Sequence, residues 1–284
     1  MTGEVQTFRG PVAARDLGTT LLHEHVFVGH PELDLDLPHP EWCEDVAVEA
    51  AAAGLERLWD LGVRTVVDLT VLGLGRDVTR VGRVAERTRM QLVASTGYYT
   101  AGSLPAYFHT HGPGRLVGGP DPLVELFARD IEHGIAGTDV RAGMLKVVTD
   151  HQGLTPDVQR VMEAAAAAHR RTGVPMTTHT HAPSQNGRDQ LVFLTARGVS
   201  ADRIVIGHCG DSEDLDYLRE LMDAGATIGM DRFGMEHVLS DDARTATVLT
   251  LLAEGYADRM VLSHDGGVTR LKNAASWDST IRSA

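Results

Sequence analysis

Short apolar segments alternate with helix-like segments along the chain, and this alternation limits the possible folds more than any other feature. Strands joined through helices form parallel sheets, because a parallel connection needs a long crossover. The sequence therefore predicts an α/β fold. The predicted strands are Thr19–His25, Val63–Thr70, Leu92–Thr96, Met144–Val148, Val174–His179, Arg203–His208, Ala226–Met230 and Met260–His264.

Helix-like stretches with apolar residues at helical spacing lie between the strands. The clearest are Glu44–Leu61, Leu123–Ile135, Pro156–Arg171 and Asp214–Ala224. Glycines that suit a helix stop precede several strands, namely Gly62, Gly173, Gly198 and Gly225. Strand and helix alternate eight times without a linker, which predicts one (β/α)₈ TIM barrel domain over 1–284, with 1–18 as an N-terminal lead-in. A doubly wound open sheet is the alternative.

The end of the chain departs from this pattern. Residues 266–284 begin with two glycines and end in a segment rich in Ser, Thr and Arg. We therefore expect the last βα unit to be shortened or altered and 266–284 to form an atypical C-terminal tail. Such a change would affect how the barrel closes.

Charge and cysteine content exclude several classes of protein. The formal net charge of −13 argues against a nucleic-acid partner. Two cysteines do not make a disulfide framework, and we find neither a signal peptide nor an apolar run long enough to span a membrane. We expect a cytoplasmic protein that binds neither nucleic acid nor membrane.

Residues that bind metal ions recur at the carboxyl ends of the predicted strands, which converge on one face of a barrel. Side chains alternate along a strand, so the two histidines of His23-Glu24-His25 share a face. Four imidazoles and a carboxylate are too many ligands for one tetrahedral zinc ion, and a pair of ions about 3.5–4 Å apart would use them. The candidates are His23, His25, His179, His208 and Asp265.

Lys146, at the end of the fourth predicted strand, allows three interpretations. A protonated amine beside two dications is unfavourable, and carboxylation by CO₂ would convert it into an anionic carbamate that bridges both metals. The second is a Schiff-base lysine, and the third is a lysine stem lining the barrel. With the histidines present, we rank the carbamate first.

These segments resemble the phosphotriesterase family of the amidohydrolase superfamily, and most closely its phosphotriesterase-like lactonases. The resemblance rests on six segments in order, which are Thr20–His25, Leu145–Val148, Thr177–Thr180, Ile206–Asp211, Gly229–Gly234 and Leu262–Asp265.

The resemblance implies a metal site with a defined division of ligands. His23, His25 and Asp265 would hold the buried ion, His179 and His208 the more exposed ion, and carboxylated Lys146 both. Two divalent ions are expected, with zinc first and cobalt, iron or manganese as alternatives.

The resemblance also implies a hydrolase of the EC 3.1 type that opens lactones with a metal-bridging hydroxide. Asp265 would carry the proton to the leaving group, Tyr99 would lie beside the exposed metal, and Arg232 would sit at the substrate pocket. Acyl-homoserine or related lactones are the expected substrates, which suggests quorum quenching, with promiscuous aryldialkylphosphatase activity on organophosphates. A homodimer is expected. The alternatives are a dedicated phosphotriesterase, or a metal-binding but catalytically impaired homologue with an altered C-terminus.

Two further carboxylates are candidates for orienting a ligand histidine, namely Asp68 and Asp211. Asp211 could equally cap the helix that begins near Ser212.

Overall fold

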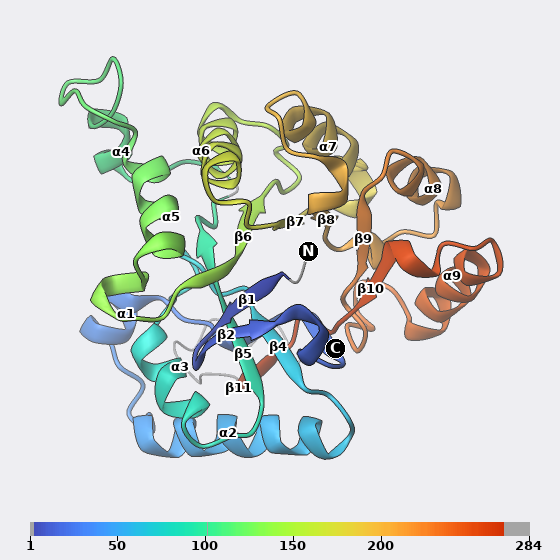
Figure 1. The fold of residues 1–284 in the computed structure, drawn as a ribbon, viewed down its shortest axis with the longest axis horizontal. Helices are drawn as coiled ribbons and strands as arrows, with labels where there is room; N and C mark the ends of the chain where they lie inside the picture. Colours follow the sequence, from blue (N-terminus) through green and yellow to red (C-terminus); the bar gives the residue numbers. More distant parts are fainter. Residues whose placement is uncertain (1–2, 101, 270–284) are drawn as a thin grey trace.

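A computed structural model describes residues 3–100 and 102–269, and shows a parallel sheet curved into a barrel with helices outside it (Figure 1). The sheet order is β10-β9-β8-β7-β6-β5-β4-β3-β11, so neighbours in the barrel wall follow one another in the chain. This confirms the predicted TIM barrel. The eight wall strands are β3 (Thr20–Phe27), β4 (Thr65–Asp68), β5 (Gln91–Gly97), β6 (Ala142–Val148), β7 (Met176–His179), β8 (Ile204–Ile206), β9 (Thr227–Met230) and β10 (Met260–Leu262).

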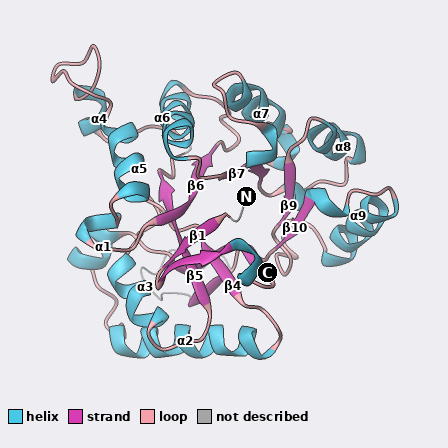
Figure 2. Ribbon diagram, viewed as in Figure 1, coloured by secondary structure: helices cyan, strands magenta, loops and turns pink. Residues whose placement is uncertain are grey.

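Helices surround the barrel wall in Figure 2, and their apolar faces pack on the outer face of the strands. Thr155 caps the helix α6 (Pro156–Thr172) as expected, because its side chain accepts a hydrogen bond from the backbone N–H of Val158. Gly173 ends that helix in the left-handed region, at φ +75°, where a side chain would be strained. The helices are α1 (Pro31–Asp36), α2 (Glu44–Asp60), α3 (Val78–Ala85), α4 (Ala106–Thr110), α5 (Pro122–Glu132), α6 (Pro156–Thr172), α7 (Gly187–Thr195), α8 (Leu215–Asp223) and α9 (Asp241–Ala253).

The chain closes the barrel by changing its pairing partner after β10. The predicted last strand, Met260–His264, is too long, because β10 ends at Leu262. The backbone then pairs with β3. Asp265 N–H donates to the carbonyl of His23, and His25 N–H donates to the carbonyl of Gly266, both at 3.0 Å. Strand β11 (Gly267–Thr269) continues this parallel pairing, and the rest of the predicted tail lies outside the described residues.

The predicted lead-in forms an antiparallel hairpin of β1 (Glu4–Thr7) and β2 (Gly10–Ala13). Val5 packs with Val93 and Met144 of the barrel interior, at the amino ends of the strands. The hairpin therefore covers the end of the barrel opposite to the strand ends that carry the candidate ligands.

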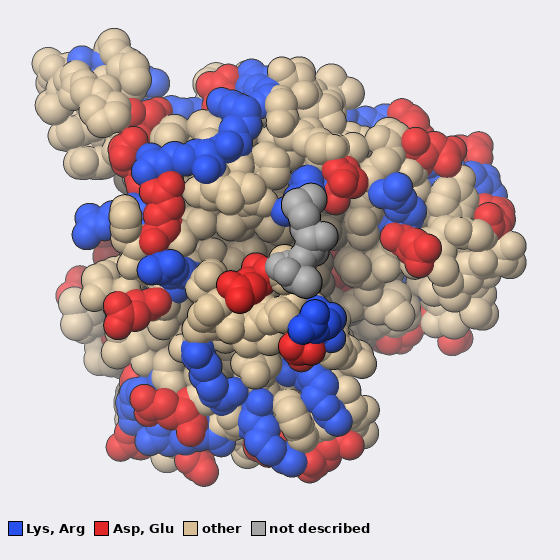
Figure 3. All heavy atoms as spheres, in the orientation of Figure 1, with Lys and Arg blue, Asp and Glu red and all other residues tan. Residues whose placement is uncertain are grey.

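The surface carries both signs of charge. Figure 3 shows acidic and basic side chains interspersed over the face in view. Among the described residues, no helix combines the length and apolar character that crossing a bilayer requires.

Candidate metal centre

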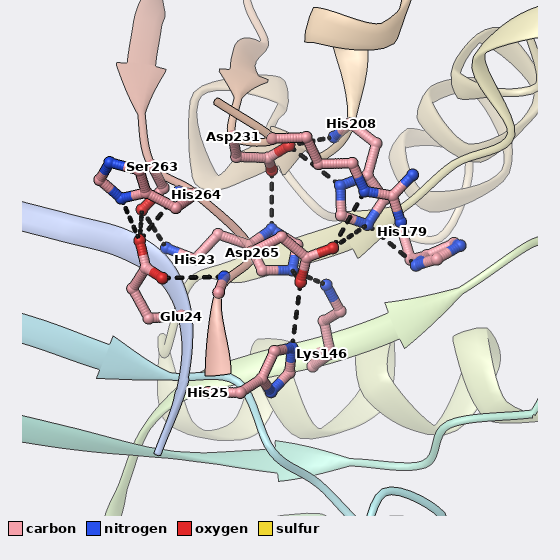
Figure 4. A network of polar contacts seen from close by, with 12 residues as sticks. His23, Glu24, His25, Lys146, His179, His208, Asp231, Ser263, His264 and Asp265 are labelled. Carbon is pink, nitrogen blue, oxygen red and sulfur yellow. Dashed lines mark hydrogen bonds and ion pairs between the residues drawn. The ribbon is translucent and has the colours of Figure 1, made fainter. Parts of the chain in front are cut away.

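The six predicted metal ligands come together at the carboxyl ends of the strands. Strand β3 supplies His23 and His25, and β6 supplies Lys146. His179 ends β7, while His208 and Asp265 follow β8 and β10. Figure 4 shows these side chains converging on one region, although they are far apart in the sequence.

The first group consists of His23, His25 and Asp265, whose ligand-type atoms could hold a metal ion. Asp265 Oδ1 lies 3.2 Å from His25 Nε2 and 3.5 Å from His23 Nε2. Lys146 Nζ lies 2.8 Å from the same His23 Nε2 and 3.3 Å from the carbonyl of Thr178. A carboxylate, two imidazoles and the lysine amine therefore surround one point inside the barrel.

The second group consists of His179 and His208 and lies next to the first group. His208 Nε2 lies 2.9 Å from His179 Nδ1 and 3.8 Å from Asp265 Oδ2. The rings of His23 and His208 are 4.7 Å apart. Asp265 thus places one carboxylate oxygen near each group.

Asp231, at the end of β9, orients two of these histidines. Its Oδ2 lies 2.7 Å from His23 Nδ1, while its Oδ1 accepts the backbone N–H of His208 at 2.8 Å and lies 3.0 Å from His208 Nδ1. With Nδ1 engaged in both rings, Nε2 is left to face the site, as in metal-bound histidines held by a carboxylate. Glycine makes room for this carboxylate, because a Cβ on Gly229 would lie 2.4 Å from Asp231 Oδ2.

No role for Asp231 was predicted from the sequence. The sequence did contain a signal for it. Asp231 is a carboxylate directly after a predicted strand, and Gly229 lies two residues before it.

A second orienting chain supports His25. Its Nδ1 lies 2.9 Å from Thr70 Oγ1, which in turn donates to Asp68 Oδ1 at 2.6 Å. Asp68 therefore reaches a candidate ligand histidine, but through the hydroxyl of Thr70, which was not predicted. Since the hydroxyl donates to Asp68, it accepts from His25 Nδ1–H, and Nε2 again carries the free lone pair.

Burial sets the protonation of the site. It lowers the pKa of His179 and of His208 well below the usual value, and Lys146 or Arg232 nearby adds to this. Burial raises the pKa of Asp265, but the surrounding imidazoles, His208 first, hold that pKa well below its ordinary range. Neutral imidazoles beside an ionised carboxylate are the protonation states that a cation requires.

Burial also lowers the pKa of Lys146 from 10.5 to about 8. The lysine is almost fully enclosed, at 1% exposure. The neutral amine is therefore a minor form at pH 7 and becomes the main form above about pH 8.

Tyr99 and Arg232 lie at the edge of the site. The Tyr99 ring packs edge-on against His179, at 5.6 Å between centroids. Arg232 Nε donates to Asp265 Oδ2 at 2.9 Å, and Arg232 Nη1 donates to Asp211 Oδ2 at 2.8 Å. Arg232 therefore contacts a predicted ligand directly.

Both interpretations of Asp211 are wrong. It pairs with Arg232 and with the buried Arg244 instead of a histidine, and Asp214 caps α8. These two arginines approach Asp211 from the loop after β9 and from α9, a pairing that the linear sequence does not show.

Comparison with known proteins gives a consistent result. Residues 3–279 match the Phosphotriesterase family. An aryldialkylphosphatase of Saccharolobus solfataricus (strain ATCC 35092 / DSM 1617 / JCM 11322 / P2) is 39% identical, over 89% of this chain and 78% of that protein.

Two solved structures are also similar to this chain. The phosphotriesterase from Mycobacterium tuberculosis has a TM-score of 0.94 at 46% identity, and the match covers 99% of this chain and 86% of that chain. A structure from work on engineering organophosphate hydrolysis from a weak promiscuous lactonase template has a TM-score of 0.84 at 34% identity, over 97% and 86% of the two chains.

Proposed function

Because this chain belongs to the phosphotriesterase family and is a metal-dependent hydrolase, we propose that it opens lactones at a centre of two divalent cations. His23, His25 and Asp265 hold one ion, and His179 and His208 hold the other. Zinc is the expected metal, with cobalt, iron or manganese as alternatives.

One observation carries the proposal. Asp265 reaches toward His25 with one oxygen and toward His208 with the other, while the Nδ1 atoms of His23 and His208 are occupied by one carboxylate of Asp231. This donor set fits two adjacent cations, since each imidazole is fixed with its remaining nitrogen toward the site.

Lys146 completes the centre as a carbamate. The neutral amine is the form that attacks CO₂, and burial supplies it by lowering the pKa to about 8. The addition gives a carbamic acid, which loses a proton to solvent and becomes an anionic carbamate beside both groups of ligands. A Schiff-base lysine is the competing hypothesis, and it would be trapped at Lys146 by borohydride in the presence of a carbonyl substrate.

The bound ions would activate water and polarise the reacting carbonyl or phosphoryl oxygen. The chain supplies the remaining functions. Asp265 is ionised and accepts the proton of the attacking water, then passes it to the leaving oxygen. Burial raises the pKa of Tyr99, so its hydroxyl stays protonated and donates a hydrogen bond to the substrate oxygen as charge develops there. Arg232 holds Asp265 Oδ2 in place.

The substrate class is supported by similarity. The structure derived from a weak promiscuous lactonase template favours a lactone, and the aryldialkylphosphatase favours phosphotriester hydrolysis at the same centre. We propose acyl-homoserine or related lactones as the main substrates and organophosphates as secondary ones.

The test compares kcat/KM for γ- and δ-lactones with that for paraoxon, using protein loaded with zinc or cobalt in bicarbonate. We expect the lactones to be preferred. A clear preference for paraoxon would instead identify a dedicated phosphotriesterase. A metal-loaded, monodisperse protein that hydrolyses neither would be a catalytically impaired homologue.

We also propose that the protein is a cytoplasmic homodimer. Light scattering during size-exclusion chromatography would measure the mass of the assembly, and a monomer across the working concentration range would contradict the proposal.

A further inference from the structure

Asp265 has an unusual backbone conformation. Its φ is +51°, in the left-handed region that residues with a Cβ rarely adopt. It stands where the chain leaves β9 as a partner and begins to pair with β3. Residues in such conformations persist only when their surroundings impose them, and they concentrate at functional sites.

The carboxylate of Glu24 accepts hydrogen bonds from the backbone on both sides of Asp265. Its Oε1 accepts the backbone N–H of His264 at 2.9 Å, and its Oε2 accepts the backbone N–H of Gly266 at 3.0 Å. The side chains of His264 and Ser263 also contact Oε1, each at 3.0 Å. One buried carboxylate thus accepts the backbone N–H groups of the residues immediately before and after the strained residue.

The same network reaches β3. Ser263 Oγ accepts the backbone N–H of His23 at 3.0 Å while it donates to Glu24. Glu24 lies between His23 and His25 in the sequence, and alternation along β3 directs it away from the two imidazoles, toward the turn at 263–266 (Figure 4). Glu24 therefore connects the strand that carries two proposed ligands to the turn that carries the third.

We propose that Glu24 is a positioning residue that holds Asp265 in its left-handed conformation, so that Oδ1 points at His23 and His25. The expected effect on metal binding rests on the proposed metal centre. Loss of the Glu24 hydrogen bonds would lower the affinity for the ion held by His23, His25 and Asp265 more than the affinity for the other ion. The claim that Glu24 fixes the backbone conformation of Asp265 does not depend on a bound metal ion.

The test uses Glu24→Gln in the full-length protein. The amide NH₂ that replaces one carboxylate oxygen cannot accept a hydrogen bond, so either the His264 N–H or the Gly266 N–H loses its acceptor. In crystals of the metal-free variant we expect Asp265 to leave the left-handed region and its Oδ1 to move away from His25 Nε2. An unchanged Asp265 in the variant would overturn the proposal.

Cobalt provides the second readout. We expect wild-type protein to bind about two Co²⁺ per chain and Glu24→Gln to lose one of them at a chelator concentration at least about 10-fold lower, with a changed visible spectrum. Equal cobalt retention by the two proteins would contradict the inference. Wild-type protein that binds no Co²⁺ would refute the metal centre instead, while the Asp265 geometry would still decide the role of Glu24.

Two controls separate positioning from general stability. Asp130→Asn alters an equally buried carboxylate, which pairs with Arg76 and Thr96, and should lower stability without selective loss of one ion. His264→Ala keeps both peptide contacts to Glu24 and should leave Asp265 in place. If Glu24→Gln does not fold, Glu24→Asp keeps the charge on a side chain one methylene shorter and is expected to release Asp265 in the same way.

Discussion

At the scale of single residues, the candidate site depends on side chains that hold the ligands as much as on the ligands. Asp231 contacts two histidines, His23 and His208. A third histidine, His25, contacts the Thr70 hydroxyl, which is hydrogen-bonded to Asp68. Each contact fixes which ring nitrogen faces the site. Metal affinity should therefore be sensitive to residues that touch no metal.

Asp231→Asn tests this dependence. The amide keeps the shape of the side chain but cannot accept from both His23 and His208, so one ring should lose its orientation. We expect metal affinity, measured by competition with a chelator, to fall about 10–100-fold while the fold is retained. Asp60→Asn, at an exposed carboxylate paired with Arg89, is the control and should leave affinity unchanged. Equal affinity in Asp231→Asn would show that the contact does not organise the site.

Lys146 predicts a pH dependence. Its pKa is lowered to about 8, and only the neutral amine reacts with CO₂, so the rate of carbamate formation should rise with pH through about 8 and then level off. The measurement is the ¹³C NMR signal of metal-free protein supplied with labelled CO₂ at constant dissolved concentration. A rate that keeps rising toward pH 10 would indicate an unperturbed lysine. Lys146→Met should lack the carbamate signal that comes from position 146.

The candidate ligand residues that the structure brings together could be found in the sequence because each stands at or near the end of an apolar segment. Asp231 also follows a predicted strand, but its contacts with two histidines, like the contacts of Glu24 with the turn at 263–266, could not be predicted from local sequence. His23 lies 208 positions from Asp231 in the sequence, and His264 lies 240 positions from Glu24, so only the barrel fold brings these pairs together. These contacts follow from the pairing of strands and not from local pattern.

At the scale of elements, strands were predicted more completely than helices. Apolar runs bounded by turns give a clear strand signal. The glycine stop at Gly198 and the eightfold alternation imply helices before β8 and after β9, but the ranges of α7 and α9 were not predicted. Gln190 on α7 and Arg244 and Thr247 on α9 are buried, so polar residues interrupt the apolar stripe that marks a helix. The side-chain amide of Gln190 donates hydrogen bonds to Thr149 Oγ1 and to the carbonyl of His179. These bonds connect α7 to the strand end that carries His179.

Gly97 shows how closely the wall strands approach at the site. It ends β5 at φ +149°, and a Cβ there would lie 1.9 Å from the carbonyl oxygen of Lys146 on β6. Gly97→Ala must therefore separate the two strands, and we expect a loss of about 2 kcal/mol or more in the free energy of unfolding, together with weaker metal binding.

Denaturant titration measures the stability change, and chelator competition measures the metal. Gly82→Ala on α3 is the matched control, because a Cβ at that position meets nothing within 4 Å. It should stabilise the helix by up to about 1 kcal/mol. A neutral effect of Gly97→Ala would show that β5 and β6 can separate without cost.

At the scale of the whole molecule, one continuous sheet joins strands from Thr20 to Thr269, which supports the single-domain organisation that we propose. The proposed metal centre lies at one end of this barrel and draws ligands from β3, β6 and β7 and from the turns after β8 and β10. Bound ions should therefore link distant parts of the chain and stabilise the folded state as a whole.

Metal removal tests this link. An ion present at 100 times its dissociation constant adds about 2.7 kcal/mol to the folded state. We therefore expect chelation to lower the thermal midpoint, measured by calorimetry, by on the order of 5–10 °C per ion. Restoring zinc with bicarbonate should recover the midpoint. A midpoint that does not respond to chelation would show that no ion bridges these strands.

Anomalous diffraction from crystals grown with zinc or cobalt and bicarbonate tests the central claim most directly. We predict two metal peaks, one among His23, His25 and Asp265 and one beside His179 and His208, with carbamate density on Lys146 between them. An unmodified Lys146 amine and no anomalous peak among these residues, in fully supplemented protein, would contradict the account.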